Sequence, residues 1–260
     1  PVPAPGLKAS APPETCLPRA PLGTALYVHV PFCVVKCPYC DFFSVEAKGQ
    51  DLGATVRALL NEARARAPRS PRTVFIGGGT PSLLPEPLLV ELIDGLDEIT
   101  GFRAAALEVT AECNPESLDR DKARLLTELG VTRLSLGIQS LDPDILTFLG
   151  RAHGPEDGLR ALEAAQATGA DVSVDMIYAS PGQSTEDWEG ELARVLEFEP
   201  HHLSAYNLTI EEGTMFHVLR ERGELTPAPE EVELASFERT RELAEAAGLG
   251  RYEISNYARP

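Results

Sequence analysis

Short β-rich apolar runs alternate with longer segments of helical period along most of this chain, and this alternation restricts its fold more than any other feature. Strands that alternate with helices imply a parallel sheet with right-handed crossovers. The expected strands are Leu26–Val30, Thr73–Ile76, Leu107–Ala111, Leu134–Ile138, Val172–Ile177 and His202–Leu208. The expected helices are Asp51–Ala67, Glu86–Ile99, Asp119–Leu129, Pro155–Thr168, Thr185–Phe198 and Glu230–Ala247. These βα units suit an open doubly wound sheet or a complete or partial barrel, which periodicity does not separate.

The beginning of the chain differs from this α/β part. Residues 1–23 are dense in proline and alanine and show no hydrophobic period. Such a segment cannot bury enough apolar surface to offset the entropy of ordering, so we expect a flexible tail there.

The charge of the chain restricts its partners. The sequence has 23 Lys and Arg against 40 Asp and Glu, a net charge of −17, which repels phosphate backbones and anionic lipid headgroups. No stretch approaches the roughly 20 apolar residues of a membrane span, and no signal peptide pattern opens the chain. We therefore expect a cytoplasmic protein that neither binds nucleic acid nor spans a membrane.

Three cysteines lie together at C-x3-C-x2-C spacing, in the loop that follows the first expected strand: Cys33, Cys37 and Cys40. Cys16 and Cys113 stand apart, so the five cysteines do not form a disulfide framework. Three thiolates can bind three irons of a [4Fe–4S] cluster and leave one iron open to another ligand. A structural zinc ion would need a fourth protein ligand, and none follows at zinc-finger spacing. Free thiols or a redox pair would fit the same spacing.

Polar residues also collect at the carboxyl ends of the later strands, where both α/β architectures place their chemistry. Gly77–Gly79 follow the second strand and let a backbone approach a ligand closely, although many glycine runs are simple turns. Glu112 follows the third strand and would bring a carboxylate to the mouth of the sheet, whereas Glu116 reads as a solvated loop residue. Cys113 reads as a small buried thiol rather than a further metal ligand.

Asp175 is a charged residue inside an otherwise apolar strand. Burial of an unpaired carboxylate is costly, so Asp175 is expected to face a polar cavity or to meet a cation such as Arg151. A structural salt bridge is the alternative interpretation.

The segment YVHVPFCVVKCPYCDFF resembles the signature of the radical S-adenosylmethionine (SAM) superfamily, CxxxCxxC with an aromatic residue, here Tyr39, before the third cysteine. The resemblance runs from Tyr27 to Tyr257 and implies a partial (βα)6 barrel of the TIM type. It also implies that Cys33, Cys37 and Cys40 bind a [4Fe–4S] cluster whose open iron is chelated by SAM. One electron would then cleave SAM to methionine and a 5′-deoxyadenosyl radical. The cofactor-binding residues that the resemblance implies are Tyr27, Tyr39, Gly78, Gly79, Thr80, Glu112, Gln139, Arg151, Asp175 and Thr209.

The phrases YVHVPFC, GGGTPS, SLGIQS and HLSAYNLTIEEGT look like the oxygen-independent coproporphyrinogen III oxidase-like group, and within it the radical SAM heme chaperones. True oxidases of this group carry another cysteine two residues after the third ligand, where this chain has Phe42. The resemblance therefore implies heme as cargo, passed to respiratory hemoproteins, and leaves enzymatic activity open. An oxidase or related radical enzyme would also fit, as would a zinc or thiol protein without SAM chemistry. The acceptor, the electron donor and the heme ligands are not identified by the sequence.

Members of this group continue past YEISNYARP into a C-terminal domain. The resemblance thus implies a radical SAM core over residues 24–250 and the start of a truncated C-terminal region over residues 251–260. Tyr252–Tyr257 is expected to form a last strand with an exposed edge.

Overall fold

The computed structural model describes residues 23–260, so the expected tail lies outside the described residues except for Gly23. Six parallel strands form the main sheet, and each pairs with the next along the chain. They are β1 (Ala25–Val30), β4 (Thr73–Gly78), β5 (Glu108–Cys113), β6 (Arg133–Gln139), β7 (Asp171–Tyr178) and β8 (His202–Asn207). The order β1-β4-β5-β6-β7-β8-β10-β9 leaves β1 and β9 at opposite ends, so the described strands form an open sheet rather than a closed barrel.

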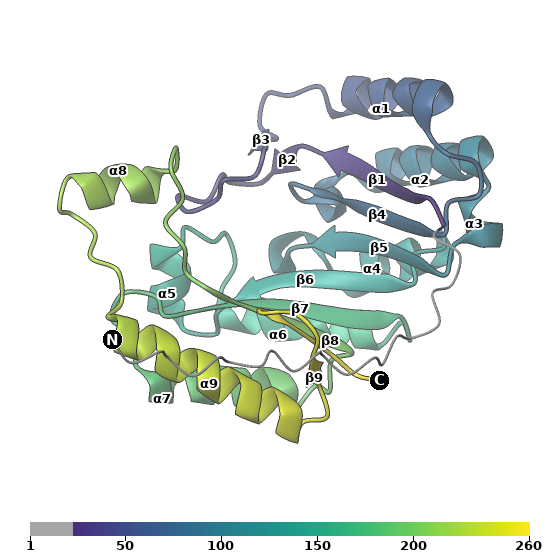
Figure 1. The fold of residues 1–260 in the computed structure, drawn as a ribbon. Helices are drawn as coiled ribbons and strands as arrows, with labels where there is room; N and C mark the ends of the chain where they lie inside the picture. The colour runs from purple at the N-terminus through teal and green to yellow at the C-terminus, as the bar shows by residue number, and fades with distance from the viewer. Residues whose placement is uncertain (1–22) are drawn as a thin grey trace, which may run out of the picture.

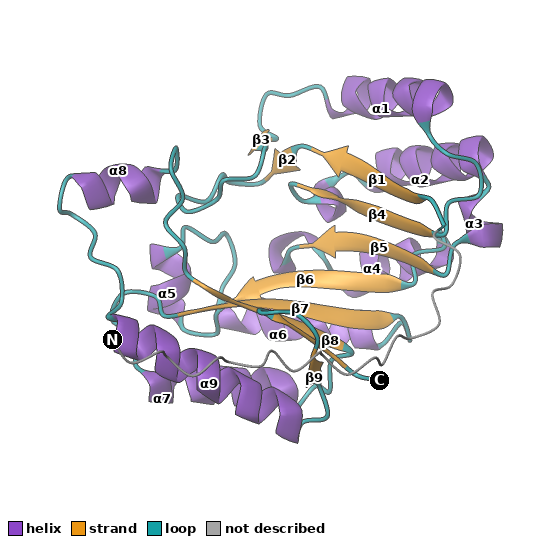
Figure 2. Ribbon diagram, in the orientation of Figure 1, coloured by secondary structure: helices purple, strands orange, loops and turns teal. Residues whose placement is uncertain are grey.

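A helix follows each parallel strand before the next one begins, which confirms the expected α/β alternation (Figure 1). These helices are α1 (Leu52–Arg66), α2 (Glu86–Thr100), α4 (Arg120–Glu128), α6 (Pro155–Gln166), α7 (Thr185–Leu196) and α9 (Glu230–Ala246). Shorter elements are α3 (Phe102–Ala105), α5 (Pro143–Phe148), α8 (Met215–Glu221) and the 3-10 turns η1 (Pro81–Leu83) and η2 (Pro115–Ser117). The arrows of β1, β4, β5, β6 and β7 all point toward the side that holds α5, α8 and the small pair β2 (Phe32–Cys33) and β3 (Val45–Glu46) (Figure 2).

The two faces of β6 differ in chemistry and show where the interior of the sheet lies. Leu134, Leu136 and Ile138 are fully buried in the core that the helices cover. The alternate residues, including Ser135 and Gly137, line a cavity on the other face. A closed TIM barrel fills this inner face with bulky branched side chains. Small and polar side chains here leave the inner face hollow.

The expected last strand at Tyr252–Tyr257 is wrong in extent. The chain forms β9 (Gly250–Arg251), turns, and returns as β10 (Asn256–Ala258), which pairs antiparallel with both β9 and β8. The backbone amide of Tyr252 donates to the carbonyl of Asn256 at 3.1 Å, and Nδ2 of the Asn256 side chain donates to the Glu253 carboxylate at 2.7 Å. These local bonds favour a turn between β9 and β10. Because β10 pairs with β8, the end of the chain extends the main sheet.

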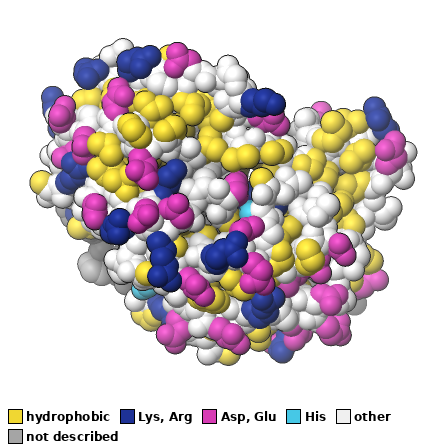
Figure 3. Space-filling view, turned by 180° about the vertical axis from the view of Figure 1, so that it is seen from behind, with side chains coloured by type: hydrophobic (Ala, Val, Ile, Leu, Met, Phe, Trp, Pro, Cys, Tyr) yellow, Lys and Arg dark blue, Asp and Glu magenta, His cyan; other side chains and the backbone are white. Residues whose placement is uncertain are grey.

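The surface is mixed in charge on the face seen from behind. Acidic side chains, basic side chains and apolar side chains are interspersed there (Figure 3). Within the described part of the chain, no helix has the length and apolarity that crossing a membrane requires.

Candidate cofactor site

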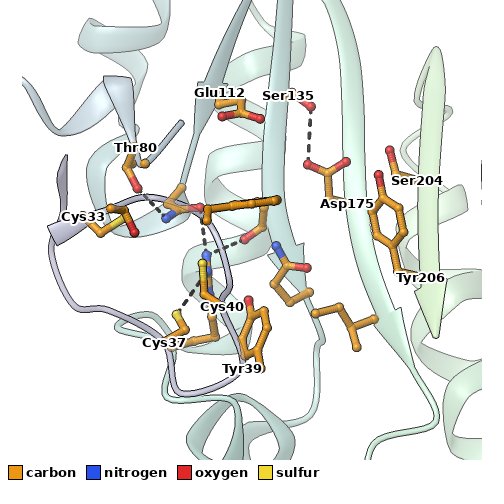
Figure 4. Close-up of a pocket in the computed structure, with 18 of the residues that line it drawn as sticks. Cys33, Cys37, Tyr39, Cys40, Thr80, Glu112, Ser135, Asp175, Ser204 and Tyr206 are labelled. Atoms are coloured by element: carbon orange, nitrogen blue, oxygen red, sulfur yellow. Dashed lines mark hydrogen bonds between the residues drawn. The ribbon is translucent and has the colours of Figure 1, made fainter. Parts of the chain in front are cut away.

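A cavity of about 530 Å³ lies on the inner face of the sheet and reaches the carboxyl ends of the strands. Its size falls in the range of small-molecule and cofactor sites. Figure 4 shows Cys33, Cys37 and Cys40 on one side of this cavity, Glu112 and Ser135 at another, and Asp175, Ser204 and Tyr206 across from the cysteines. The structure therefore brings the cysteine loop and the strand-end residues of the sequence analysis together.

Main-chain bonds position the cysteine loop. The amide of Ala47 donates to the carbonyl of Cys33 at 2.9 Å, and the amide of Cys40 donates to the carbonyl of Cys37 at 3.1 Å. From the other end of the chain, the amide of Phe216 in α8 donates to the carbonyl of Pro38 at 3.0 Å. The loop is thus held from both sides, with its three free thiols half-buried.

The number of thiols in the loop fits a [4Fe–4S] cluster. A structural zinc site takes four protein ligands, and the loop supplies three free thiols. In a [4Fe–4S] cluster each cysteine binds a different iron. Three thiols that line one cavity can therefore hold three irons and leave the fourth open to another ligand.

Arg151 connects this loop to the strand ends. Its Nη1 donates to Cys37 Sγ at 3.7 Å, and its Nη2 donates to Asn114 Oδ1 and to the carbonyl of Gly137, both at 2.8 Å. Burial raises the pKa of the Cys37 thiol, and the charge and hydrogen bond of Arg151 oppose that rise. The buried Nε of Arg151 has no hydrogen-bond partner among the described residues.

The glycine run packs against protein as well as lining the cavity. Gly78 has a φ of +110°, which favours glycine, and its amide donates to Glu112 Oε2 at 2.8 Å. A Cβ on Gly79 would lie 2.5 Å from the carbonyl oxygen of Phe32. The amide of Thr80 donates to that same oxygen at 2.6 Å. The backbone at position 79 therefore lies so close to Phe32, at the start of the cysteine loop, that only glycine fits there.

Two carboxyl groups face the same space. Burial raises the pKa of Glu112 to about 7; the amide of Gly78 opposes this shift and the negative charge of Asp175 adds to it. Burial also raises the pKa of Asp175, which accepts a hydrogen bond from Ser135 at 3.4 Å. The polar cavity expected around Asp175 is present, whereas Arg151 forms its direct bonds elsewhere.

The raised pKa of Glu112 predicts a pH-dependent stability of the protein without cofactors. The folded state binds this proton more tightly than the unfolded chain does. The resulting stabilisation is present below about pH 4.5 and is lost as the pH rises through about 7. Between pH 5 and pH 8 the free energy of unfolding should fall by up to about 3 kcal/mol through this group.

Urea unfolding of the parent and of Glu112→Gln at both pH values measures this loss, and the variant should abolish that part of it. Glu128→Gln is the matched control, because this carboxylate on α4 is 64% exposed. An equal pH dependence in Glu112→Gln and the parent would contradict the assignment.

Several of the remaining candidate residues lie at the cavity, and one does not. The cavity lining includes Tyr39, Gln139 and Thr209. Tyr27 is not part of this lining; its side chain is 57% exposed and its hydroxyl bonds to His29 Nδ1 at 2.9 Å.

Sequence reasoning missed residues that act on the site through other side chains. Asn114 accepts from Arg151 and donates to Thr80 Oγ1 at 2.9 Å, so it links two strand ends. Glu116 was expected to be solvated, which is wrong: its Oε2 lies 3.2 Å from Nδ1 of the buried His153, and its side chain is 13% exposed. The hydrogen bond of His153 keeps the pKa of Glu116 below its usual range, against the effect of burial. The Asn-Pro sequence before Glu116 was the local signal of an ordered turn.

Comparison with known proteins identifies the class. The Radical SAM superfamily matches residues 27–195, most of the sheet and its cysteine loop, and the chain belongs to this superfamily. Among curated proteins it is similar to the heme chaperone HemW of Escherichia coli, with 40% identity over 245 residues that cover 91% of this chain and 63% of the relative. It is also 37% identical over 253 residues to the mitochondrial radical S-adenosyl methionine domain-containing protein 1 of Mus musculus, covering 95% of this chain and 56% of that protein.

Among solved structures, the coproporphyrinogen III oxidase (HemN) of Escherichia coli superposes with a TM-score of 0.80 at 24% identity, over 94% of this chain and 57% of that chain. This similarity confirms the fold. The chain spans about three fifths of the length of the curated relatives it matches.

Proposed function

We propose that this chain is the radical SAM core of a heme chaperone, which binds one [4Fe–4S] cluster and SAM and passes heme to respiratory hemoproteins. The observation that carries the proposal is the meeting of three thiols, Arg151 and two raised-pKa carboxyl groups in one cavity. The similarity to curated heme chaperones over most of the chain supports the choice of cargo. The cytoplasm, where thiols stay reduced, is the compartment that suits such a loop.

The proposal assigns different roles to the side chains that line the cavity. Cys33, Cys37 and Cys40 would hold the cluster, which when bound supplies the electron that cleaves SAM. Arg151 places a positive charge beside Cys37 and so offsets the charge of a bound thiolate. Arg151 and Glu112 both line the cavity, so a guanidinium and a carboxyl group are available to SAM.

The mouth of the cavity suits a flat apolar cargo. Phe42, Tyr206 and Tyr252 line it and are 69%, 43% and 66% exposed. Exposed aromatic side chains that gather at one cavity indicate a binding surface. His202 also lines the cavity, but its ring nitrogens already contact Ser173 and Tyr252, at 2.9 and 2.8 Å. We therefore propose aromatic contact, rather than a histidine ligand from this residue, as the contribution of the core to heme binding.

Oxygen-independent coproporphyrinogen III oxidase activity is the second candidate, and the fold similarity to that oxidase favours it. Phe42 argues against it, because the resemblance places a cysteine of the true oxidases at this position. Anaerobic turnover of coproporphyrinogen III would support the oxidase and contradict the chaperone.

Anaerobic reconstitution with iron and sulfide, followed by absorption and electron paramagnetic resonance spectra, tests the proposal. We expect a broad absorption near roughly 400 nm and a reduced-cluster signal that shifts when SAM is added. Titration with hemin should give a saturable Soret band. A colourless protein with stoichiometric zinc would contradict the cluster, and a cluster signal without heme binding would contradict the chaperone assignment.

A further inference from the structure

The backbone at Gln139 has an unfavourable conformation at the end of β6. Its φ is +67°, and the amide of Ser140 donates to the carbonyl of Ile138 at 2.9 Å, which closes a three-residue turn around Gln139. A turn of this kind with positive φ is rare and strained in a residue other than glycine. It persists only where neighbouring groups hold the residues on both sides.

Glu191 on α7 holds the side of the turn that follows Gln139. Its side chain is buried, and its Oε2 accepts hydrogen bonds from Ser140 Oγ at 2.5 Å, the amide of Leu141 at 2.5 Å and the amide of Asp142 at 3.2 Å. Its Oε1 accepts from Gln183 Nε2 at 2.8 Å. Hydrogen-bond donors surround both oxygens of this buried carboxylate. An ionised carboxylate suits this place because it only accepts.

His153 holds the side of the turn that precedes Gln139. Its Nε2 donates to the carbonyl of Ile138 at 3.1 Å, and its ring is fully buried. The register between β6 and β7 also shifts between Gly137 and Gln139. The strained residue is therefore fixed between two buried side chains that come from different parts of the chain.

The turn determines where the side-chain amide of Gln139 points. Gln139 lines the cavity, and its Nε2 lies 2.9 Å from the position that a Cβ on Gly137 would occupy. Nη2 of Arg151 donates to the Gly137 carbonyl, so the amide and the guanidinium lie over the same strand end.

We propose that Glu191 is a positioning residue for SAM binding, which acts by holding the Gln139 turn so that the amide of Gln139 points into the cavity. The inference rests on the proposed function, in which SAM binds in this cavity, and on Gln139 as a SAM contact, which the resemblance implies. Glu191 itself does not line the cavity. Its effect on SAM must therefore pass through the turn.

Two variants test the hydrogen bonds of Glu191, one that removes some of them and one that restores them. In Glu191→Gln, one accepting oxygen is replaced by an NH2 group, which only donates. This NH2 group then faces either the donors of the turn or the NH2 group of Gln183, so the hydrogen bonds on that side are lost. The exchange Gln183→Glu with Glu191→Gln moves the carboxylate to position 183. Oε1 of the new glutamine can then accept from the turn, and its NH2 can donate to the new glutamate. That glutamate can still accept from the amide of Ser180, as Gln183 Oε1 does at 3.3 Å.

The experiment measures the dissociation constant of SAM from its effect on the electron paramagnetic resonance signal of the reconstituted protein, with iron content as a separate readout. We expect Glu191→Gln to keep its iron and to raise the dissociation constant about tenfold or more. In a Gln139→Ala background, Glu191→Gln should raise the dissociation constant of SAM by less than about twofold further, because the side-chain amide that Glu191 positions is absent. The exchange variant should return the dissociation constant toward that of the parent.

Thr240→Val is the control for a general loosening of α7. Thr240 Oγ1 accepts from Trp188 Nε1 at 2.9 Å, so this variant removes a buried bond of the same helix away from the turn. It should lower the melting temperature and leave the SAM dissociation constant unchanged. Parent-like SAM binding by Glu191→Gln, or an undiminished effect in the Gln139→Ala background, would overturn the inference alone. Failure of the parent to bind SAM would overturn the proposed function and the inference with it.

Discussion

Replacement of Cys37 by alanine should abolish cluster assembly on this protein. Two thiolates would remain where three irons need protein ligands, and the sulfur that Arg151 contacts would be lost. Reconstituted parent protein should contain about four irons per chain, and Cys37→Ala should contain almost none, with the absorption near roughly 400 nm lost in parallel. Iron and sulfide analysis measures both proteins, and far-ultraviolet circular dichroism checks that the variant is folded.

Cys113→Ala is the matched control for this result. Cys113 also lines the cavity, but burial raises the pKa of its thiol to about 12, and its Sγ lies 3.7 Å from the carbonyl of Ala111. A thiol held in the protonated form is a poor metal ligand, so Cys113→Ala should keep its iron. Iron retained by Cys37→Ala, or lost from Cys113→Ala, would show that the ligand set is wrong.

Replacement of Gly79 by alanine should damage both stability and the cluster site. The new Cβ would lie 2.5 Å from the carbonyl oxygen of Phe32 and 2.8 Å from its carbonyl carbon and amide nitrogen. These are backbone atoms beside Cys33, so the strand or the loop must move. We expect the free energy of unfolding to fall by about 3 kcal/mol or more. The iron content after reconstitution should fall as well, because the loop that carries the thiols is displaced.

Urea unfolding without cofactors and iron analysis after reconstitution measure the two effects of Gly79→Ala. Gly190→Ala is the control, because Gly190 lies in α7 with open space where its Cβ would be. That change should stabilise the protein by about 0.5–1 kcal/mol through helix propensity and a less flexible unfolded chain. A Gly79→Ala protein as stable as the parent would contradict the close approach of the two segments.

The features that the sequence predicted well are local. Hydrophobic period identified the six parallel strands and the helix after each, because burial on one face imposes that period on consecutive residues. The parallel sheet then brought Glu112, Gln139 and Asp175 to one cavity. The spacing of the cysteines singled out their loop in the same way.

The features that the sequence did not predict depend on contacts between distant segments. Glu191 on α7 bonds to residues some fifty positions earlier, and no local pattern separates it from the other glutamates of that helix. The backbone amide of Phe216 in α8 bonds to the cysteine loop, and no local sequence pattern around Phe216 predicts this contact. The β9–β10 turn was missed because an antiparallel return after a parallel array depends on the bonds between Tyr252, Glu253 and Asn256.

The two faces of β6 have an evolutionary consequence. Leu134, Leu136 and Ile138 hold the sheet to its helices, while Ser135 and Gly137 face the cavity and contribute little to that adhesion. Mutations on the cavity face can change what the cavity admits while the residues that hold the sheet to its helices stay the same. Selection can therefore act on ligand choice and on folding through different residues of the same strand, so such a scaffold can acquire new chemistry while its fold stays the same.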